Sequence, residues 1–425
     1  MLKKTKLYNG IIYNNYLKEM CNSNIYIHNS RGIMYTLMKE LFPIHRSITG
    51  EGNRKTLQII QKHIPLTIQE IPTETQVFDW KIPKEYTIKK AYIKNSKGET
   101  IVDIQNNNLH VLSYSRPVNK HISFNELDTH LFYLKDFPDW IPYRTTYYND
   151  TWGFCLTYNQ YKNLDKNDTY HVHVDSELFD GSLSYGELII NGQTNKEILI
   201  STYMCHPSMC NDNLSGVVVA TYLAKHILEQ KNNYYTYRFV FVPESRGAIG
   251  YLSKNINVMK QYTIGGYVIS CIGDDGDFTY LQTRKENQIT DKITLFLLEQ
   301  EKVKYKIRKY YTCGSDERQY NYPGVDLHIG SLMRTKYTEF NEYHTSADNL
   351  SFVTDTNLIK SLDMYKKCIT IFENNHIYKA QTLCEPRLGI HGLWDTVGGS
   401  KKKDNTIFRK ILYYCDGTND VVDIC

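Results

Sequence analysis

Side chains able to bind a metal or move a proton stand directly after two strongly apolar segments of this chain. His206 and Asp212, six residues apart, follow the first segment, and Glu244 follows the second. A histidine and a carboxylate beside a helix start suit a divalent metal, and a carboxylate at a strand end can act as general base toward a water molecule. Taken separately, Asp212 could instead cap a helix, and Glu244 could pair with Arg246 at the surface.

Further candidates follow two later segments of the same kind. Cys271 and Asp274 lie at the end of a third apolar segment, where either could be a ligand or part of an acidic turn. His344 stands in a loop before the last long amphipathic segment. That segment predicts a helix, for which Ser346 or Asp348 is the expected cap.

Another group of candidates is the run of three consecutive charged residues Asp316, Glu317 and Arg318. Three consecutive charges are costly to bury without partners, so either a substrate-facing role or a salt-bridge cluster would explain them. Cys205 or Cys210 as a thiol nucleophile is an alternative kind of chemistry. The chain contains no His-Glu-x-x-His, no Gly-x-Ser-x-Gly and no phosphate-binding loop motif.

The segments that carry these residues alternate between strand and helix patterns from about residue 195 to 375. This alternation predicts an α/β fold, in which a mixed sheet is flanked by helices and the functional residues lie at the carboxyl ends of the strands. The predicted strands are near 197–206, 237–245, 265–273 and 325–333, and the predicted helices near 214–230, 247–256, 289–302 and 358–374.

The remaining sequence predicts additional parts. Residues 1–75 read as helical and are expected to join residues 191–380 in one α/β domain. Residues 76–190 show short alternating stretches broken by turn residues, which predicts an inserted, mostly-β domain. Residues 381–425 read as a helix, a turn and a short second helix, which predicts a partial winged-helix module.

Composition excludes several classes of protein. The chain has 50 basic and 46 acidic residues, a net charge of +4, so we expect no nucleic-acid partner. The ten cysteines have no regular spacing, which favours reduced thiols, and no apolar run is long enough to span a membrane. We therefore predict a cytoplasmic protein without a membrane partner.

Four motifs resemble those of the zinc aminopeptidase superfamily, the co-catalytic metalloexopeptidases: HPSMCNDNLSG, PESRGAIGYL, SDERQY and EYHTSADNL. More closely, the chain resembles an uncharacterised bacterial branch of aminopeptidase-like proteins with an inserted small domain and a C-terminal winged helix. Segments such as LFPIHRSITGEGNR and IPYRTTYYNDTWGFC carry this closer resemblance. It implies zinc ligands at His206, Asp212 and His344, and a general base at Glu244.

The chain departs from the superfamily pattern at three positions that would hold the second zinc and its surroundings. Ser208 replaces the aspartate expected two residues after the first histidine, and Ser245 replaces the second glutamate of a pair. Ser270 or Cys271 stands where another aspartate is expected. One zinc ion per chain is therefore the prediction, with Asp274 or Cys271 as the possible additional ligand.

The function that these observations predict is zinc-dependent amide hydrolysis, with Asp316, Glu317 and Arg318 binding substrate. The substrate would be a short peptide, or an N-acylated amino sugar or sugar-linked amino acid of surface-polysaccharide metabolism, as the resemblance implies. A non-catalytic binding protein that retains the fold is one alternative. A zinc-dependent acyl transferase or cyclase is another. A homo-oligomer is left open.

Overall fold

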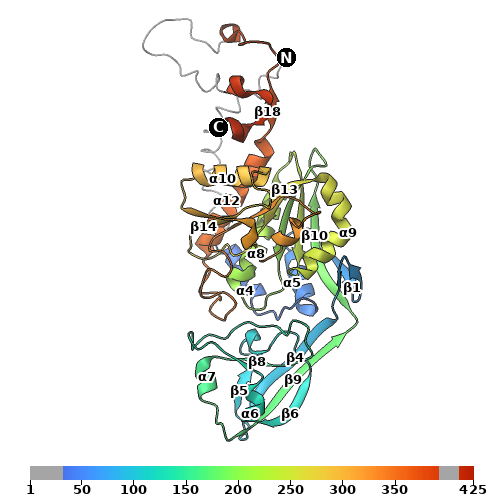
Figure 1. Cartoon of the computed structure of the whole chain (residues 1–425), viewed down its shortest axis with the longest axis vertical. Coiled ribbons are helices and arrows are strands. Elements are labelled where there is room, and N and C mark those ends of the chain that lie inside the picture. The colour runs from blue at the N-terminus through green and yellow to red at the C-terminus, as the bar shows by residue number, and fades with distance from the viewer. Residues whose placement is uncertain (1–31, 392–410) are drawn as a thin grey trace.

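The computed structural model describes residues 32–391 and 411–425, and its centre is a mixed eight-stranded sheet (Figure 1). The strand order is β1-β10-β12-β11-β13-β16-β14-β15. Strands β12, β11, β13 and β16 run parallel to one another, whereas β1, β10 and β14 pair antiparallel with their inner neighbours. The α/β fold class predicted from the sequence is confirmed. The strands of this sheet are β1 (Thr67–Pro72), β10 (Ser182–Ile190), β11 (Glu197–Tyr203), β12 (Thr236–Val242), β13 (Thr263–Val268), β14 (Phe278–Leu281), β15 (Tyr305–Arg308) and β16 (Ile329–Met333).

Helices cover both faces of the sheet because its central strands are apolar on both sides. All seven residues of β11 and of β12 are buried, as expected for strands in the middle of such a sheet. One core joins the sheet to α4 (Ile33–Leu41), α5 (Glu51–Gln61), α8 (Ser215–Glu229), α10 (Ile289–Gln300) and α12 (Asp355–Asn374). A second core joins the other face to α9 (Arg246–Tyr262) and α11 (Glu317–Tyr320).

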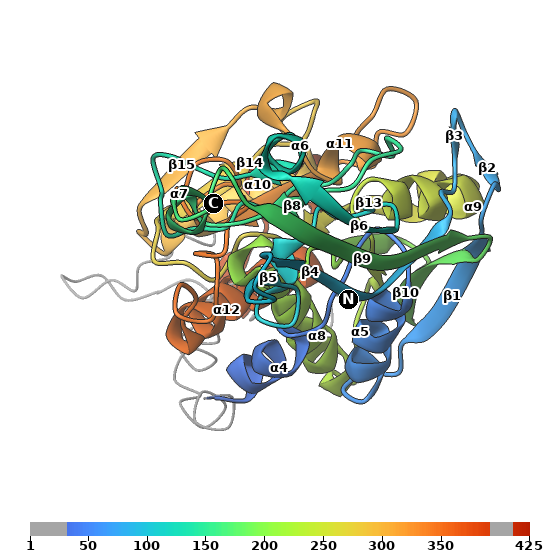
Figure 2. The same cartoon turned by 90° about the horizontal axis from the view of Figure 1, so that it is seen from below.

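A separate four-stranded antiparallel sheet, of order β5-β4-β9-β6, lies beyond one end of the main sheet (Figures 1 and 2). In residues 169–175 of β9, buried positions alternate with more accessible ones, and the buried side chains belong to the sheet's own core. Its strands are β4 (Glu85–Lys94), β5 (Thr100–Asp103), β6 (Val118–Ser123) and β9 (Thr169–Phe179). The smaller elements here are the pair β7 (Leu131–Phe132) with β8 (Phe154–Cys155), and the helices α6 (Phe124–Asp128) and α7 (Tyr158–Lys162). The pair β2 (Gln76–Val77) with β3 (Trp80–Lys81) instead lies beside α9, where Val77 joins the second core of the main sheet.

Strand β10 does not belong to this separate sheet, although the sequence placed its residues 182–190 in the insertion. It pairs with β1 on one side and β12 on the other, inside the main sheet. Its residues are buried on both faces, a pattern that identifies a strand but not the sheet it joins.

At the C-terminal end, β17 (Ile377–Lys379) pairs antiparallel with β18 (Asp416–Asp420), and the short helix α14 (Val421–Ile424) follows. The turn expected between two helices is therefore partly a strand. The first of those helices falls largely on residues 392–410, which lie outside the described part of the chain. Among the described helices, none combines the length and the apolar character needed to cross a bilayer.

Candidate metal centre

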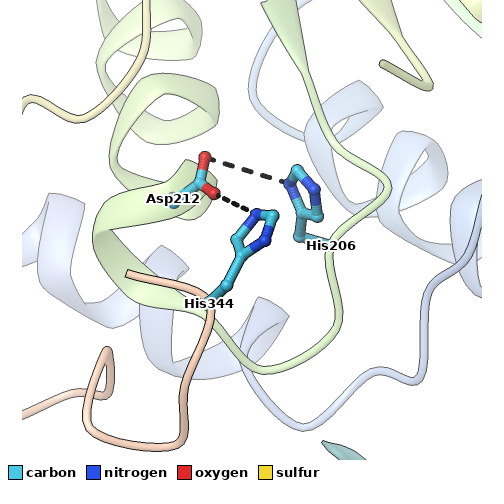
Figure 3. A group of neighbouring side chains, drawn as sticks. All are labelled: His206, Asp212 and His344. Atoms are coloured by element: carbon cyan, nitrogen blue, oxygen red, sulfur yellow. Dashed lines mark ion pairs between the residues drawn. The ribbon is translucent and has the colours of Figure 1, made fainter. Parts of the chain in front are cut away.

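Three side chains from distant parts of the chain meet at the carboxyl end of β11. His206 and Asp212 come from the loop between β11 and α8, and His344 comes from the loop before α12 (Figure 3). One ligand atom from each lies within 4.8 Å of the other two. Asp212 stands between the histidines, with His344 Nε2 at 3.1 Å from Oδ2 and His206 Nδ1 at 3.9 Å from Oδ1. Two imidazole nitrogens and a carboxylate are the donor set of a catalytic zinc site.

The atoms that face one another in this group have no hydrogen-bond partners. His206 Nδ1, Asp212 Oδ2 and His344 Nε2 are all buried and make no hydrogen bond to any residue that the structure describes, although the latter two atoms form the 3.1 Å ion pair. Buried polar atoms are normally hydrogen-bonded, since an unsatisfied one costs about 1–3 kcal/mol. Three such atoms converging on one point fit a divalent metal ion, which would satisfy all of them together.

The protonation states at neutral pH also suit a metal. Burial lowers the pKa of His206 to about 4, so its imidazole is neutral. Burial would raise the pKa of Asp212, but His206, His344 and the Tyr203 hydroxyl outweigh it and lower that pKa to about 2. Tyr203 donates its O–H to Asp212 Oδ1. Neutral histidine and ionised carboxylate are the forms that bind metal.

Asp348 holds the backbone of the Asp212 loop, a role that the sequence did not reveal. Its carboxylate accepts N–H bonds from Cys210, Asn211 and Asp212, at 3.1, 2.6 and 2.8 Å. The prediction that Ser346 or Asp348 caps the following helix is wrong. Helix α12 begins later, and its cap is Thr354, whose hydroxyl accepts the N–H of Asn357.

Arg46 fixes the His206 side of the loop. Its side chain is fully buried, donates from Nε to the His206 carbonyl at 3.0 Å and from Nη1 to the Leu41 carbonyl. A guanidinium that donates to backbone carbonyls of two segments holds those segments in one geometry. This arginine lies in the LFPIHRSITGEGNR segment, and the family resemblance of that segment was the sequence feature that could have pointed to it.

Glu244 faces the same group from the carboxyl end of β12. Its Oε2 lies 3.5 Å from His206 Nε2, and its Oε1 accepts the Ser315 hydroxyl at 2.6 Å. Burial, and after it the charge of Asp212, raise the pKa of the Glu244 carboxyl to about 7. A pKa near neutrality suits a general base. The surface pairing with Arg246 that the sequence left open is absent among the described ion pairs.

The three consecutive charges expected to bind substrate have different surroundings. Asp316 and Glu317 are fully buried, whereas Arg318 is exposed. Asp316 Oδ1 accepts the Ser245 N–H, and Glu317 Oε1 accepts N–H bonds from Gly314 and Ser315. Arg318 donates to Ser245 Oγ at 2.9 Å. These contacts support the Glu244 loop, and direct contact of the three residues with substrate stays a prediction.

The possible additional ligands lie close by but outside the three-residue group. Cys271 Sγ is 3.9 Å from Asp212 Oδ1. Asp274 uses both oxygens within the protein, where Oδ2 accepts from the Asn211 side chain and Oδ1 from Gly276 N–H and the Thr335 hydroxyl. Among the described residues, the group of His206, Asp212 and His344 is the single set of three or more with metal-binding geometry.

The serines at positions that depart from the superfamily pattern make hydrogen bonds within the protein. Ser208 Oγ donates to the Phe42 carbonyl and accepts from the Asn108 side chain. The N–H and Oγ of Ser245 bind Asp316 and Arg318, as described above. Ser208, Ser245, Cys271 and His344 all have left-handed backbone conformations, with φ between 44° and 60°. Such strained residues are concentrated at functional sites.

Tyr143, from the residues inserted between β1 and β10, reaches the metal centre directly. Its ring meets those of His206 and His344 edge-on, with centroids 5.4 and 5.1 Å apart. Its N–H donates to the His344 carbonyl at 2.8 Å, and Pro142 bridges to Thr345. The inserted segment therefore forms one wall of a cleft of about 650 Å³, and the His344 loop forms another.

Comparisons with known proteins agree with this architecture. Residues 35–375 match the family described as a domain of unknown function, DUF4910, and residues 376–425 match a winged helix-turn-helix. A Clostridium acetobutylicum protein, named as a candidate polysaccharide biosynthesis protein with an aminopeptidase-like domain, is 46% identical over 407 residues. The match covers 94% of this chain and 93% of that protein.

Solved structures show the same fold at two levels of similarity. A crystal structure of a candidate peptidase from Clostridium acetobutylicum has a TM-score of 0.87 and 45% identity, covering 95% of this chain and 93% of that one. A zinc aminopeptidase from Bacillus subtilis has a TM-score of 0.58 at 11% identity, covering 80% and 94%. The chain therefore belongs to the DUF4910 family, with the fold of zinc aminopeptidases and a winged helix-turn-helix segment at its C-terminal end.

Proposed function

We propose that this protein is a zinc-dependent amide hydrolase with one metal ion per chain. The observation that carries the proposal is the convergence of three ligand atoms without hydrogen bonds, from His206, Asp212 and His344, beside the half-buried carboxylate of Glu244. A zinc ion held by these residues would supply Lewis acidity toward the scissile carbonyl and the attacking water.

Glu244 is the residue that would move the proton. Ser315 holds its Oε1, so Oε2 is left to face His206 and can take a proton from the attacking water. The same oxygen can then deliver that proton to the departing nitrogen. Water adds to the carbonyl carbon, the carbon–nitrogen bond breaks, and the products are a carboxylic acid and an amine.

The substrate we propose is a short peptide, or an N-acylated amino sugar or sugar-linked amino acid. The cleft of about 650 Å³ has room for a group of this size, and aromatic side chains line it. The name of the Clostridium acetobutylicum relative supports the sugar class, since it refers to polysaccharide biosynthesis as well as to an aminopeptidase-like domain.

Zinc content is the first test, measured by elemental mass spectrometry on the full chain and on His206→Ala and Asp212→Ala. We expect about one zinc per chain in the unaltered protein and almost none in either variant, because each removes one of three protein ligands. Cys210→Ala is a control that should keep its zinc. Absence of zinc from the unaltered protein, before and after incubation with zinc salt, would overturn the proposal. Product mass then identifies the reaction, since hydrolysis adds one water.

A further inference from the structure

One cationic side chain in the cleft has no partner for its charge. Arg144 lines the cleft together with His344, and its guanidinium lies over the Phe132 ring at 4.5 Å from the centroid. Within residues 32–391 and 411–425, its guanidinium makes no hydrogen bond, and no carboxylate oxygen lies within 4.0 Å of it. The ring supports the guanidinium plane and leaves the N–H groups at its edge available.

Several other arginines of this protein that reach solvent are paired with carboxylates. Arg116, on the same inserted segment, binds Asp150 at 2.6 Å, and Arg308 binds Glu339 at 2.8 Å. Arg284 binds Asp326 at 2.5 Å. Among the described residues, the exposed Arg318 has no carboxylate partner either, but it donates to Ser245. Arg144 differs in that its free guanidinium lies in the cleft beside His344. Asp128 also lines the cleft, but it does not pair with Arg144.

The backbone holds Arg144 at a fixed position relative to the metal centre. The preceding residue, Tyr143, donates its N–H to the His344 carbonyl, and the Arg144 carbonyl accepts the Ser113 N–H at 3.0 Å. Ser346 adds two bonds to Ile141 on the same segment. A charge held in this way can select substrates by the distance between an anionic group and the bond to be broken.

From these contacts we infer that the cleft selects anionic substrates, and that Arg144 binds their carboxylate or phosphate group. This inference rests on the proposed function, because it names the substrate class of the same site. Guanidinium matches both anions through paired N–H bonds. Tyr143, Tyr147 and Tyr343 line the cleft and offer ring faces or edges to a sugar or amino-acid body.

Binding calorimetry on the full zinc-loaded chain tests the inference with two matched pairs of probes. The pairs are N-acetylglucosamine 1-phosphate with N-acetylglucosamine, and N-acetylalanine with its amide. We expect the charged member of at least one pair to bind about 10- to 100-fold more tightly, as for a charge-assisted hydrogen bond. The pair that shows the preference identifies phosphate or carboxylate as the anion.

Substitutions assign that preference to Arg144. Arg144→Met should abolish the preference while leaving the affinity for the neutral probe within about threefold, and Arg144→Lys should keep part of it because a point charge remains. Arg116→Met is the matched control, with the same change in net charge on the same inserted segment, and should behave as the unaltered chain does. A preference that survives Arg144→Met would mean that the anion binds zinc directly, and it would overturn the inference.

Two other outcomes separate this inference from the proposed function. Equal binding of charged and neutral probes, or no binding of any probe at millimolar concentration, overturns the inference, while zinc content and amide hydrolysis are measured independently of it. Arg144-dependent anion binding without hydrolysis of any amide would leave the inference standing and overturn the proposed function.

Discussion

The loops that follow β11 and β12 leave the same edge of the sheet, but they use their polar side chains differently. The β11 loop brings His206 and Asp212 to the centre with unpartnered ligand atoms. The residues of the β12 loop are bonded within the protein, since Ser245 binds Asp316 and Arg318, and Glu244 uses one oxygen to bind Ser315. Among the described residues, the unpartnered buried oxygens on this side belong to Asp316 and Glu317, outside that loop. Under the proposed function, one loop would accept a metal ion, and the other would hold the proton-transfer group Glu244 in place.

This difference explains why a single zinc is the better proposal for this chain. A second zinc would need ligands from the β12 loop and from the end of β13, where Ser245 is already bonded and Cys271 lies outside the ligand group. Binding a metal gains little free energy at buried polar atoms that already have partners, whereas at unpartnered atoms it removes the cost of leaving them unsatisfied. Substitutions that alter one loop at a time therefore test whether the two loops have separate roles.

The largest effect should come from Glu244→Gln. This change keeps the size of the side chain and its acceptor for Ser315 but removes the group that takes the proton. We expect amide turnover to fall by about 10²- to 10⁴-fold with zinc content unchanged, measured by single-substrate kinetics and elemental analysis. Glu339→Gln, a surface carboxylate paired with Arg308, should leave turnover unchanged. Loss of zinc together with activity in Glu244→Gln would contradict the separation of roles between the two loops.

A smaller effect should come from Asp348→Asn, which weakens the support of the β11 loop without touching a ligand. One of the three N–H groups that now face a carboxylate would face an amide N–H instead. We expect zinc affinity to fall by about 10- to 100-fold, as for other residues that orient ligands. We also expect the free energy of unfolding to fall by about 1–3 kcal/mol, measured by competition with a chelator and by urea unfolding.

Asp291→Asn is the matched control for that experiment. Asp291 is also buried and accepts bonds from Tyr280, Thr283 and Gln288, far from the metal centre. Its substitution should cost comparable stability and leave zinc affinity unchanged. Equal losses of zinc affinity in both variants would show that Asp348 acts through global stability alone.

Local sequence patterns were sufficient for the central part of the fold. Apolar runs of strand length, followed by helices with apolar periodicity, predicted β11, β12, β13 and β16, and with them the edge at which His206, Glu244 and His344 lie. The strands β14 and β15, of four residues each, extend the sheet but are too short to give a periodic signal.

Contacts between distant segments could not be predicted in the same way. Tyr143 and His344 are neighbours through a backbone hydrogen bond, yet no spacing rule relates positions 143 and 344. Asp348 accepts the N–H of Asp212, although the two residues are 136 positions apart in the sequence. A carboxylate before a helix also looks the same in sequence whether it caps the helix or binds another loop, so the cap was assigned to the wrong residue.

The smallest effect should come from Arg318→Met, on the side of the site that carries the β12 loop. Arg318 is exposed and contributes one hydrogen bond to Ser245, so its loss should change the free energy of unfolding by no more than about 1 kcal/mol. Zinc content should remain at about one per chain, because Arg318 contacts no ligand. Arg308→Met, which removes the same charge from a half-buried site paired with Glu339, is the control. A fall in zinc affinity as large as that of Asp348→Asn would mean that the β12 loop shapes the metal centre too, and the two loops would have to be treated as one unit.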